Sequence, residues 1–197
     1  SLARLLAGDP GARLNLEVVE ENPFLSRFYA APQRYAFPTQ IFVLLSRYRQ
    51  QQEFFQQDLF QQLVVSDYLF AKDRIFANLT LRDEELQLYE RVADEHQGRV
   101  PVPDLVVYLQ APVDVLLERI ARRGIRHEHL IERAYLEKLN AAYARFFHEY
   151  DAAPLLIVNA AAIDPLHNDS DYAELLAAIA RMKRGRLYFN PLRHQAL

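Results

Sequence analysis

The chain has 197 residues, a formal net charge of −3, 51% hydrophobic residues and no cysteine. These totals fit one globular domain and exclude disulfides and thiolate metal sites. They give no reason to expect a nucleic acid or an anionic membrane as a partner. Because no apolar run approaches the roughly 20 residues that span a bilayer, we expect a cytoplasmic protein without a membrane partner.

The first residues, "SLARLLAG", predict a helix that is already under way at Ser1. Leu2, Leu5 and Leu6 recur at helical spacing, and Gly8 then favours a stop. Neither a capping box nor a strand precedes this helix. We therefore expect the chain to begin inside an element whose first part lies upstream.

Short apolar runs and long helical patterns alternate along the rest of the chain. The predicted strands are 14–19, 63–66, 104–109 and 154–160. The predicted helices are 38–60, 82–97, 112–123, 132–150 and 172–183. Near-continuous apolar strands separated by helices predict a single α/β domain over 1–197, with a parallel β-sheet flanked by helices. In such sheets ligands bind beyond the carboxyl ends of the strands.

Three polar residues near the predicted strand ends and on the first long helix are candidates for a binding site. Glu17 lies near the end of a predicted strand whose other residues are apolar. Burying a carboxylate there costs free energy unless the group is paired or takes part in chemistry. The alternative is that the strand end is solvated and Glu17 faces the solvent. Gln40 and Arg47 are seven residues apart, so they share one helix face. The pair could read the edge of a planar heterocycle or belong to a solvated face.

Acidic and basic residues later in the chain suit phosphate chemistry. Asp67 follows the second strand, where an aspartate can orient magnesium or cap the next segment. Four arginines lie within eight residues: Arg119, Arg122, Arg123 and Arg126. Their guanidinium groups could bind phosphate oxygens, or they could complement the dipole at a helix C-terminus. His127 and His129 lack an evident third ligand for a metal.

Four segments, taken in order, resemble the deoxynucleoside kinase family, in particular its bacterial deoxyadenosine and deoxyguanosine kinases. They are "LEVVEENPFLSRFY", "RYAFPTQIFVLLSRYRQ", "VVSDYLFAKDRIFA" and "LERIARRGIRHEHLIERAYLEKLNAAY". The resemblance covers nearly the whole chain and implies a P-loop kinase-like three-layer fold with an arginine-rich lid at about 119–131. It also implies that a strand and a Gly-rich loop ending in Gly-Lys-Ser/Thr come before the first helix.

The resemblance assigns a role to each candidate. Glu17 matches the general base that takes the proton of the substrate's 5′-hydroxyl, while Tyr29 and Glu128 match the pair that holds the sugar 3′-hydroxyl. The groups that hydrogen-bond the base edge correspond to Gln40, Arg47 and Asp73. The pocket wall corresponds to Val19, Leu25 and Phe76.

The resemblance also assigns the charged groups around the transferred phosphoryl group. Arg119 and Arg123 match catalytic lid arginines, and Asp67 matches the residue that positions Mg²⁺. Arg122 and Arg126 are further phosphate ligands of the lid, and Arg126 could replace the arginine that often stands where this chain has Ile125.

Two further residues depart from the family pattern. Val18 stands where proline is usual, which should change backbone stiffness more than chemistry. Tyr68 stands where most relatives carry an arginine. A phenol brings no positive charge, so the site could be slower by the order of 10²–10³ that losing one such donor costs.

The resemblance implies transfer of the γ-phosphoryl group of ATP, or of another nucleoside triphosphate, to the 5′-hydroxyl of a deoxynucleoside. It favours a purine deoxynucleoside as substrate. It also implies Mg²⁺ as cofactor and a homodimer.

Two alternative functions stay open. A nucleoside monophosphate kinase would bind an anionic acceptor, which Glu17 and Glu128 would repel. A non-catalytic kinase-like module that binds nucleosides would fit Tyr68 and the absent phosphate loop.

Overall fold

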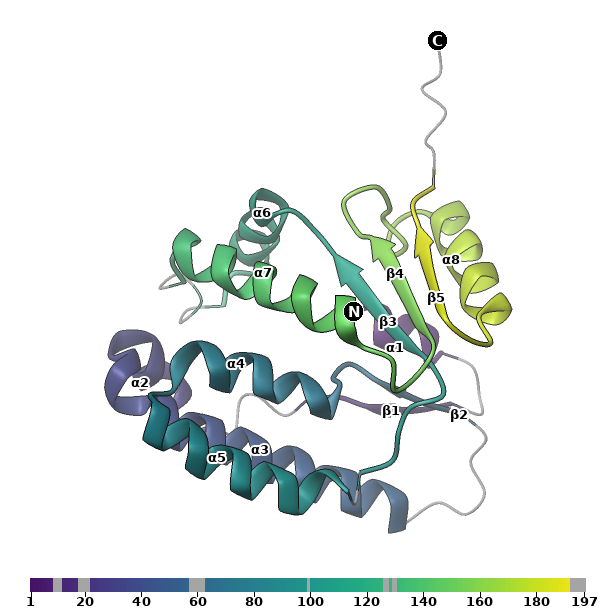
Figure 1. Ribbon diagram of the computed structural model, residues 1–197. Helices are drawn as coiled ribbons and strands as arrows, with labels where there is room; N and C mark the ends of the chain where they lie inside the picture. The colour runs from purple at the N-terminus through teal and green to yellow at the C-terminus, as the bar shows by residue number, and fades with distance from the viewer. Residues whose placement is uncertain are drawn as a thin grey trace.

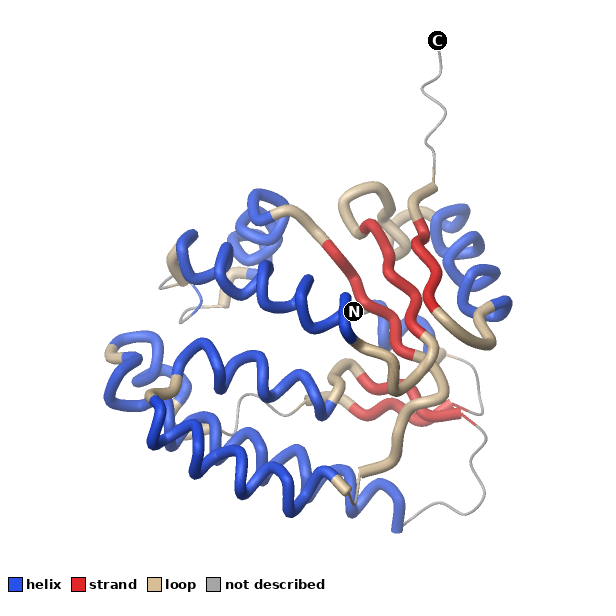
Figure 2. Tube along the Cα trace, in the orientation of Figure 1, coloured by secondary structure: helices blue, strands red, loops and turns tan. Residues whose placement is uncertain are grey.

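A computed structural model describes residues 1–8, 12–17, 22–56, 63–98, 100–125, 128 and 131–191. Its strands form two parallel sheets (Figures 1 and 2). One sheet pairs β1 (Ala12–Asn15) with β2 (Leu63–Ser66). The other has the order β3 (Val106–Gln110), β4 (Leu155–Asn159) and β5 (Arg186–Phe189). The predicted parallel pairing is therefore confirmed, but the described strands are divided between two sheets.

The strand predictions differ from the structure at the two ends of the chain. β1 ends at Asn15, short of the predicted Val19, and residues 18–21 lie outside the described part of the chain. β5 was not predicted, because its short sequence lacks a buried apolar run: Leu187 is 41% exposed and Tyr188 is 64% exposed. An edge strand of this kind is specified by pairing with β4 more than by its own sequence.

The predicted helices occur in the predicted order with shifted ends, and two short helices, Leu25–Ala30 and Asp73–Thr80, were not predicted. They are α1 (Leu2–Leu6), α2 (Leu25–Ala30), α3 (Pro32–Gln56), α4 (Asp73–Thr80), α5 (Asp83–Gln97), α6 (Val113–Arg123), α7 (Arg133–Glu149) and α8 (Asp169–Arg181), with a 3₁₀ turn η2 (Phe70–Lys72) before α4. The predicted start of α3 at Pro38 is wrong, since Pro32 takes the first helical position, where the missing N–H has no cost. Gly124 ends α6 with φ 68°, as its position after the arginines indicates.

Helices cover both faces of the three-stranded sheet. Tyr108 and Ile157 pack with Phe147 of α7 on one face. Leu156 and Val158 pack with Leu175 of α8 on the other. This arrangement is the predicted α/β layering, with α7 and α8 on opposite sides of the strands (Figure 1).

A second core joins α3, α4, α5 and η2. Leu44, Phe70, Ala77 and Tyr89 are all buried in it. α4 lies between α7 and the α3–α5 pair (Figure 1). Two polar residues of α3, Gln40 and Arg47, are buried as well.

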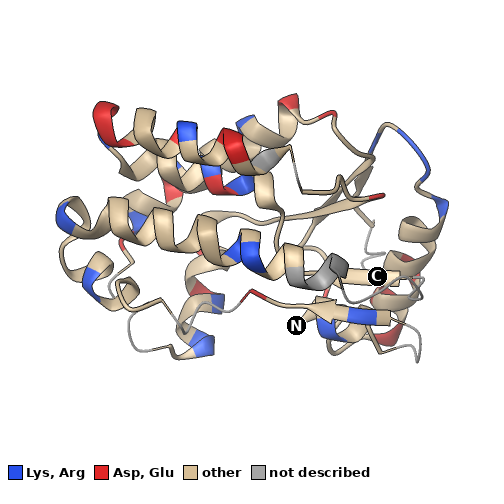
Figure 3. Ribbon diagram, turned by 90° about the horizontal axis from the view of Figure 1, so that it is seen from below, with Lys and Arg blue, Asp and Glu red and all other residues tan. Residues whose placement is uncertain are grey.

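Acidic and basic positions are interspersed over the helices in the view of Figure 3. Among the described residues, no helix combines the length and apolar character needed to cross a membrane.

Candidate active site

The ends of β1 and β2 bring two carboxylates together. The strands pair in parallel with Asn15 opposite Ser66, so the residues that follow them emerge side by side. The backbone N–H of Glu17 donates a 2.8 Å hydrogen bond to Oδ1 of Asp67. Asp67 is exposed and caps no described helix, because η2 begins after Leu69, so the capping interpretation is wrong.

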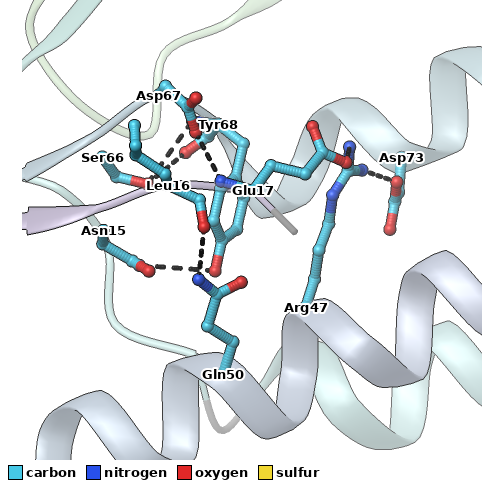
Figure 4. A network of polar contacts seen from close by, with 9 residues as sticks. All are labelled: Asn15, Leu16, Glu17, Arg47, Gln50, Ser66, Asp67, Tyr68 and Asp73. Atoms are coloured by element: carbon cyan, nitrogen blue, oxygen red, sulfur yellow. Dashed lines mark hydrogen bonds and ion pairs between the residues drawn. The ribbon is translucent and has the colours of Figure 1, made fainter. Parts of the chain in front are cut away.

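Arg47 binds two carboxylates, one from each side of the site. Its guanidinium forms ion pairs with Glu17 and with Asp73, the first residue of α4 (Figure 4). Arg47 is 5% exposed and Asp73 is 1% exposed. Buried charges of this kind are stable only when they are paired, so the three side chains hold one another in place.

Gln40 lies on the same buried face of α3, and its Nε2 donates to Oγ1 of Thr80 at 3.5 Å. The predicted shared face of Gln40 and Arg47 is thus confirmed, and the solvated-face alternative is wrong, because both side chains are buried. An amide, a guanidinium and a carboxylate therefore lie along the α3–α4 contact, with Gln40 about two helical turns from Arg47. Such an arrangement can hydrogen-bond the edge of a heterocycle.

Tyr68 contacts Asn15 and Arg47. The Asn15 amide donates to its hydroxyl at 3.4 Å, and the guanidinium carbon of Arg47 lies 5.5 Å from its ring centroid. Burial raises the pKa of Tyr68, so the phenol stays neutral. The neighbouring backbone is fixed by Gln50, whose amide donates to the carbonyl oxygen of Leu16 (Figure 4).

The arginine-rich helix α6 packs against α7 and ends at Arg123. Arg123 binds Glu128 through two hydrogen bonds, of 3.0 Å and 2.8 Å. Burial raises the pKa of Tyr29, and the Glu128 carboxylate raises it further, so the tyrosine of α2 and this ion pair are neighbours. The structure thereby brings the predicted pair Tyr29 and Glu128 together.

The other predicted residues fall in three groups. Arg119 donates to the carbonyl oxygen of Ala160 at 2.6 Å. The pKa of Asp164 is lowered mainly by its hydrogen bond with His167, and the charge of Arg122 lowers it further. Leu25 and Phe76 are half-buried. The predictions that lie outside the described residues concern Val18, Val19, Arg126, His127 and His129.

Sequence reasoning missed several residues that surround this centre. Tyr135 and Tyr143 of α7 are half-buried, and the charges of Arg47 and Glu17 act on Tyr143. Their spacing of eight residues, about two helical turns, is the signal that could have identified them. Lys72 is a third, and the charges of Glu17, Asp67 and Arg47 all act on it.

A separate cavity of about 500 Å³ opens at the carboxyl ends of β3, β4 and β5, where Gln110, Asn159 and Asn190 line it. It does not include Glu17 or Arg47. The candidate site formed by Glu17, Arg47 and Asp73 is therefore defined by its side-chain contacts and not by this cavity.

Comparison with known proteins gives a consistent result. The family model described as deoxynucleoside kinase matches residues 1–183. A deoxyguanosine kinase of Bacillus subtilis is 30% identical over 187 residues, which are 92% of this chain and 90% of that protein. A deoxyadenosine/deoxycytidine kinase of the same organism is 26% identical, covering 91% and 85%.

Solved structures show the same fold. A deoxyadenosine kinase from M. mycoides with bound dATP superposes with a TM-score of 0.78 at 22% identity, covering 91% of each chain. The same kinase with bound dCTP gives a TM-score of 0.76. The fold is therefore that of a P-loop kinase, and the family match extends over nearly all of the chain. The chain belongs to the deoxynucleoside kinase family of phosphotransferases.

Proposed function

We propose that the protein transfers the γ-phosphoryl group of ATP to the 5′-hydroxyl of a purine deoxynucleoside. The observation that carries this proposal is the Arg47 guanidinium, which joins Glu17 at the strand ends to Asp73 on α4. One end of this ion-pair chain supplies a carboxylate for a hydroxyl proton. The other end, with Gln40, supplies hydrogen-bonding groups for a base.

The proposed chemistry is mainly positioning and charge stabilisation. The Glu17 carboxylate accepts the proton of the 5′-hydroxyl while Arg47 keeps its oxygens oriented. Tyr29 and Glu128 hold the sugar. Arg119 and Arg123 then turn from their present partners, Ala160 and Glu128, toward the transferred phosphoryl group.

Asp67 fits a magnesium site. Its Oδ1 accepts from the Glu17 N–H, and the carboxylate is exposed. Mg²⁺ commonly takes one or two carboxylates together with substrate phosphates and water, so no larger acidic cluster is needed, and the described residues contain none of three or more ligands. When bound, the ion neutralises charge on the donor phosphates.

The purine preference rests on the relatives. The B. subtilis protein at 30% identity is named a deoxyguanosine kinase. The Gln40 amide presents both a donor and an acceptor, so it suits either purine or pyrimidine edges and does not itself select a base.

The test is a coupled assay with the four deoxynucleosides, ATP and Mg²⁺, with Glu17→Gln as the variant. We expect deoxyguanosine or deoxyadenosine to give the highest kcat/KM, and the variant to lose turnover while its nucleoside affinity stays nearly unchanged. Phosphorylation of a nucleoside monophosphate but of no deoxynucleoside would overturn the proposal. A large loss of nucleoside affinity in Glu17→Gln would instead make the carboxylate structural.

A further inference from the structure

Phe76 stands on α4 between the two polar contacts that join this helix to α3. Asp73, three residues before it, pairs with Arg47. Thr80, four residues after it, accepts a hydrogen bond from Gln40. Residues three and four apart are neighbours on a helix surface, so Phe76 lies on the same side of α4 as both contacts. Its ring therefore borders the amide and the guanidinium that are proposed to bind the edge of the base.

The Phe76 ring also contacts α7. Its centroid lies 6.0 Å from that of Tyr143, and the two ring planes are inclined at 85°. In the described part of the chain no other aromatic ring contacts Phe76. In an edge-to-face pair at least one face of the Phe76 ring stays clear of Tyr143. Phe76 is half-buried, so part of this residue remains accessible to a flat ligand.

Tyr143 is held by the core of the three-stranded sheet. Its ring stacks on Tyr108 with centroids 6.2 Å apart and lies 6.1 Å from the ring of Phe147. Tyr108 is 8% exposed and Phe147 is 5% exposed, and their own rings stack at 4.2 Å. Closely packed rings of this kind have few alternative positions. Tyr143 consequently links a rigid aromatic cluster to the one ring that borders the polar face of α3.

The contact with Phe76 uses the ring of Tyr143 and not its hydroxyl. Among the described residues the Tyr143 hydroxyl forms no hydrogen bond. The edge-to-face arrangement depends only on the two π-systems, which a phenylalanine at position 143 would preserve.

We propose that Tyr143 is a positioning residue that holds the Phe76 ring at the angle at which the substrate base stacks on it. The proposal rests on the kinase function proposed above. Gln40 and Arg47 can bind a base only along its edge, and a base held by its edge alone can still tilt. A fixed ring against the plane of the base restricts this tilt. Because the base takes no part in the chemistry, the contact stabilises the bound substrate and the transition state equally, so it should lower KM and leave kcat unchanged.

The first test compares Tyr143→Leu and Tyr143→Phe with Tyr150→Leu. The control residue directly follows α7, and its ring packs on Phe146 and Phe147 of the same cluster. In Tyr143→Leu we expect the KM for the preferred deoxynucleoside to rise about three- to tenfold, which corresponds to about 0.6–1.4 kcal/mol, with kcat unchanged. Tyr143→Phe and Tyr150→Leu should keep the KM of the wild type. If Tyr143→Leu does not fold, Tyr143→Met takes its place, since a flexible methionine fills irregular gaps in a core.

The second test is a double-mutant cycle of Tyr143→Leu with Phe76→Leu. If Tyr143 acts through the Phe76 ring, its replacement in the Phe76→Leu background should change KM by less than about twofold, the limit within which independent effects are normally measured. A tyrosine that only stabilises the fold would raise KM by the same factor in both backgrounds. The cycle therefore separates positioning of Phe76 from a general loss of packing.

The outcomes also separate this proposal from the kinase function. If the wild type phosphorylates deoxynucleosides and folded Tyr143→Leu keeps a KM within about twofold of it, the role of Tyr143 is wrong and the kinase function stands. An equal rise of KM in Tyr143→Phe would assign the effect to the hydroxyl and would likewise exclude positioning by the ring, as would an additive cycle. If neither the wild type nor Tyr150→Leu phosphorylates any deoxynucleoside, the proposed function is wrong and the role of Tyr143 falls with it.

Discussion

The backbone nitrogen of Glu17 and Oδ1 of Asp67 are joined by a hydrogen bond of 2.8 Å, which ties together the two strand ends that carry the proposed base and the proposed magnesium ligand. Because β1 and β2 pair in register just before these residues, the separation of the two carboxylates is set by the sheet and not by a flexible loop. A change at Asp67 can therefore act either through metal affinity or through the position of Glu17.

Asp67→Asn should separate these two effects. The asparagine keeps an oxygen that accepts the Glu17 N–H but loses the charge that favours Mg²⁺. We expect the Mg²⁺ concentration for half-maximal rate to rise by about 10–100-fold, as is typical when a metal site loses one partner. Asp67→Ala should lose kcat as well, since the backbone bond goes. Asp94→Asn, an exposed aspartate paired with Arg74, is the control. An unchanged Mg²⁺ dependence in Asp67→Asn would exclude Asp67 from metal binding.

Arg47→Met should strongly destabilise the protein. Removing the guanidinium leaves the carboxylate of Asp73, which is 1% exposed, without its partner, and breaking a buried ion pair from one side costs about 3–5 kcal/mol. Urea denaturation would measure the loss. Arg49→Met, an exposed arginine on the same helix, should change the free energy of unfolding by less than about 0.5 kcal/mol. Equal stability of the two variants would contradict the pairing.

Thr80→Val tests how the Gln40 amide is oriented. The Thr80 hydroxyl accepts from Nε2 of Gln40 at 3.5 Å and donates to the carbonyl oxygen of Phe76 at 2.7 Å. Loss of one hydrogen bond of about 1 kcal/mol should raise the KM for the preferred deoxynucleoside about five-fold and leave kcat unchanged. Thr80→Ser keeps the hydroxyl and should behave as the wild type. A fall in kcat without a change in KM would show that Gln40 does not read the base.

The pKa of Lys72 predicts a pH dependence of stability. Burial lowers this pKa from 10.5 to about 8 on folding, the charge of Arg47 lowers it further, and the charges of Glu17 and Asp67 oppose the shift. Between these two values the unfolded chain binds more protons, so this group makes the folded state more stable as pH rises from 8 toward 10. The difference in unfolding free energy between wild type and Lys72→Gln should therefore shift in favour of the wild type from pH 7.5 to pH 9.5. A difference independent of pH would mean that the ammonium is solvated.

Many helices and strands could be predicted because each is indicated by a pattern of neighbouring residues in the sequence. The strand at Leu63–Ser66 and the helix ending at Gly124 follow directly from β-branched residues and a glycine. The division of the strands between two sheets could not be predicted, because pairing depends on contacts far apart in sequence. β5 was missed for the same reason.

The arrangement of candidate site residues could be predicted where both residues lie on one helix, because their spacing in sequence fixes which face they share. Gln40 and Arg47 share a face because seven residues make about two helical turns. That Arg47 would bind both Glu17 and Asp73 was not predictable, since the contact joins a strand end, a long helix and the start of α4. Lys72 carried no pattern of its own, and its charge becomes informative only beside the carboxylates that the fold places near it.

Glu128→Gln tests the sugar contact implied by Tyr29 and the Arg123–Glu128 pair. Glu128 accepts two hydrogen bonds from Arg123, and its carboxylate acts on the neighbouring Tyr29 hydroxyl. If the carboxylate also accepts from the sugar 3′-hydroxyl, its neutralisation removes a charged hydrogen bond worth about 1.5–3 kcal/mol.

The KM for a 2′-deoxynucleoside should then rise about 10–150-fold, the range that 1.5–3 kcal/mol corresponds to. A 2′,3′-dideoxynucleoside has no 3′-hydroxyl, so its KM should be nearly the same in the variant and the wild type. Glu137→Gln, at an exposed glutamate of α7, is the matched control. If Glu128→Gln raises the KM of both nucleosides equally, the glutamate acts by positioning Arg123 at the end of α6. The sugar hydroxyl must then be held by other groups.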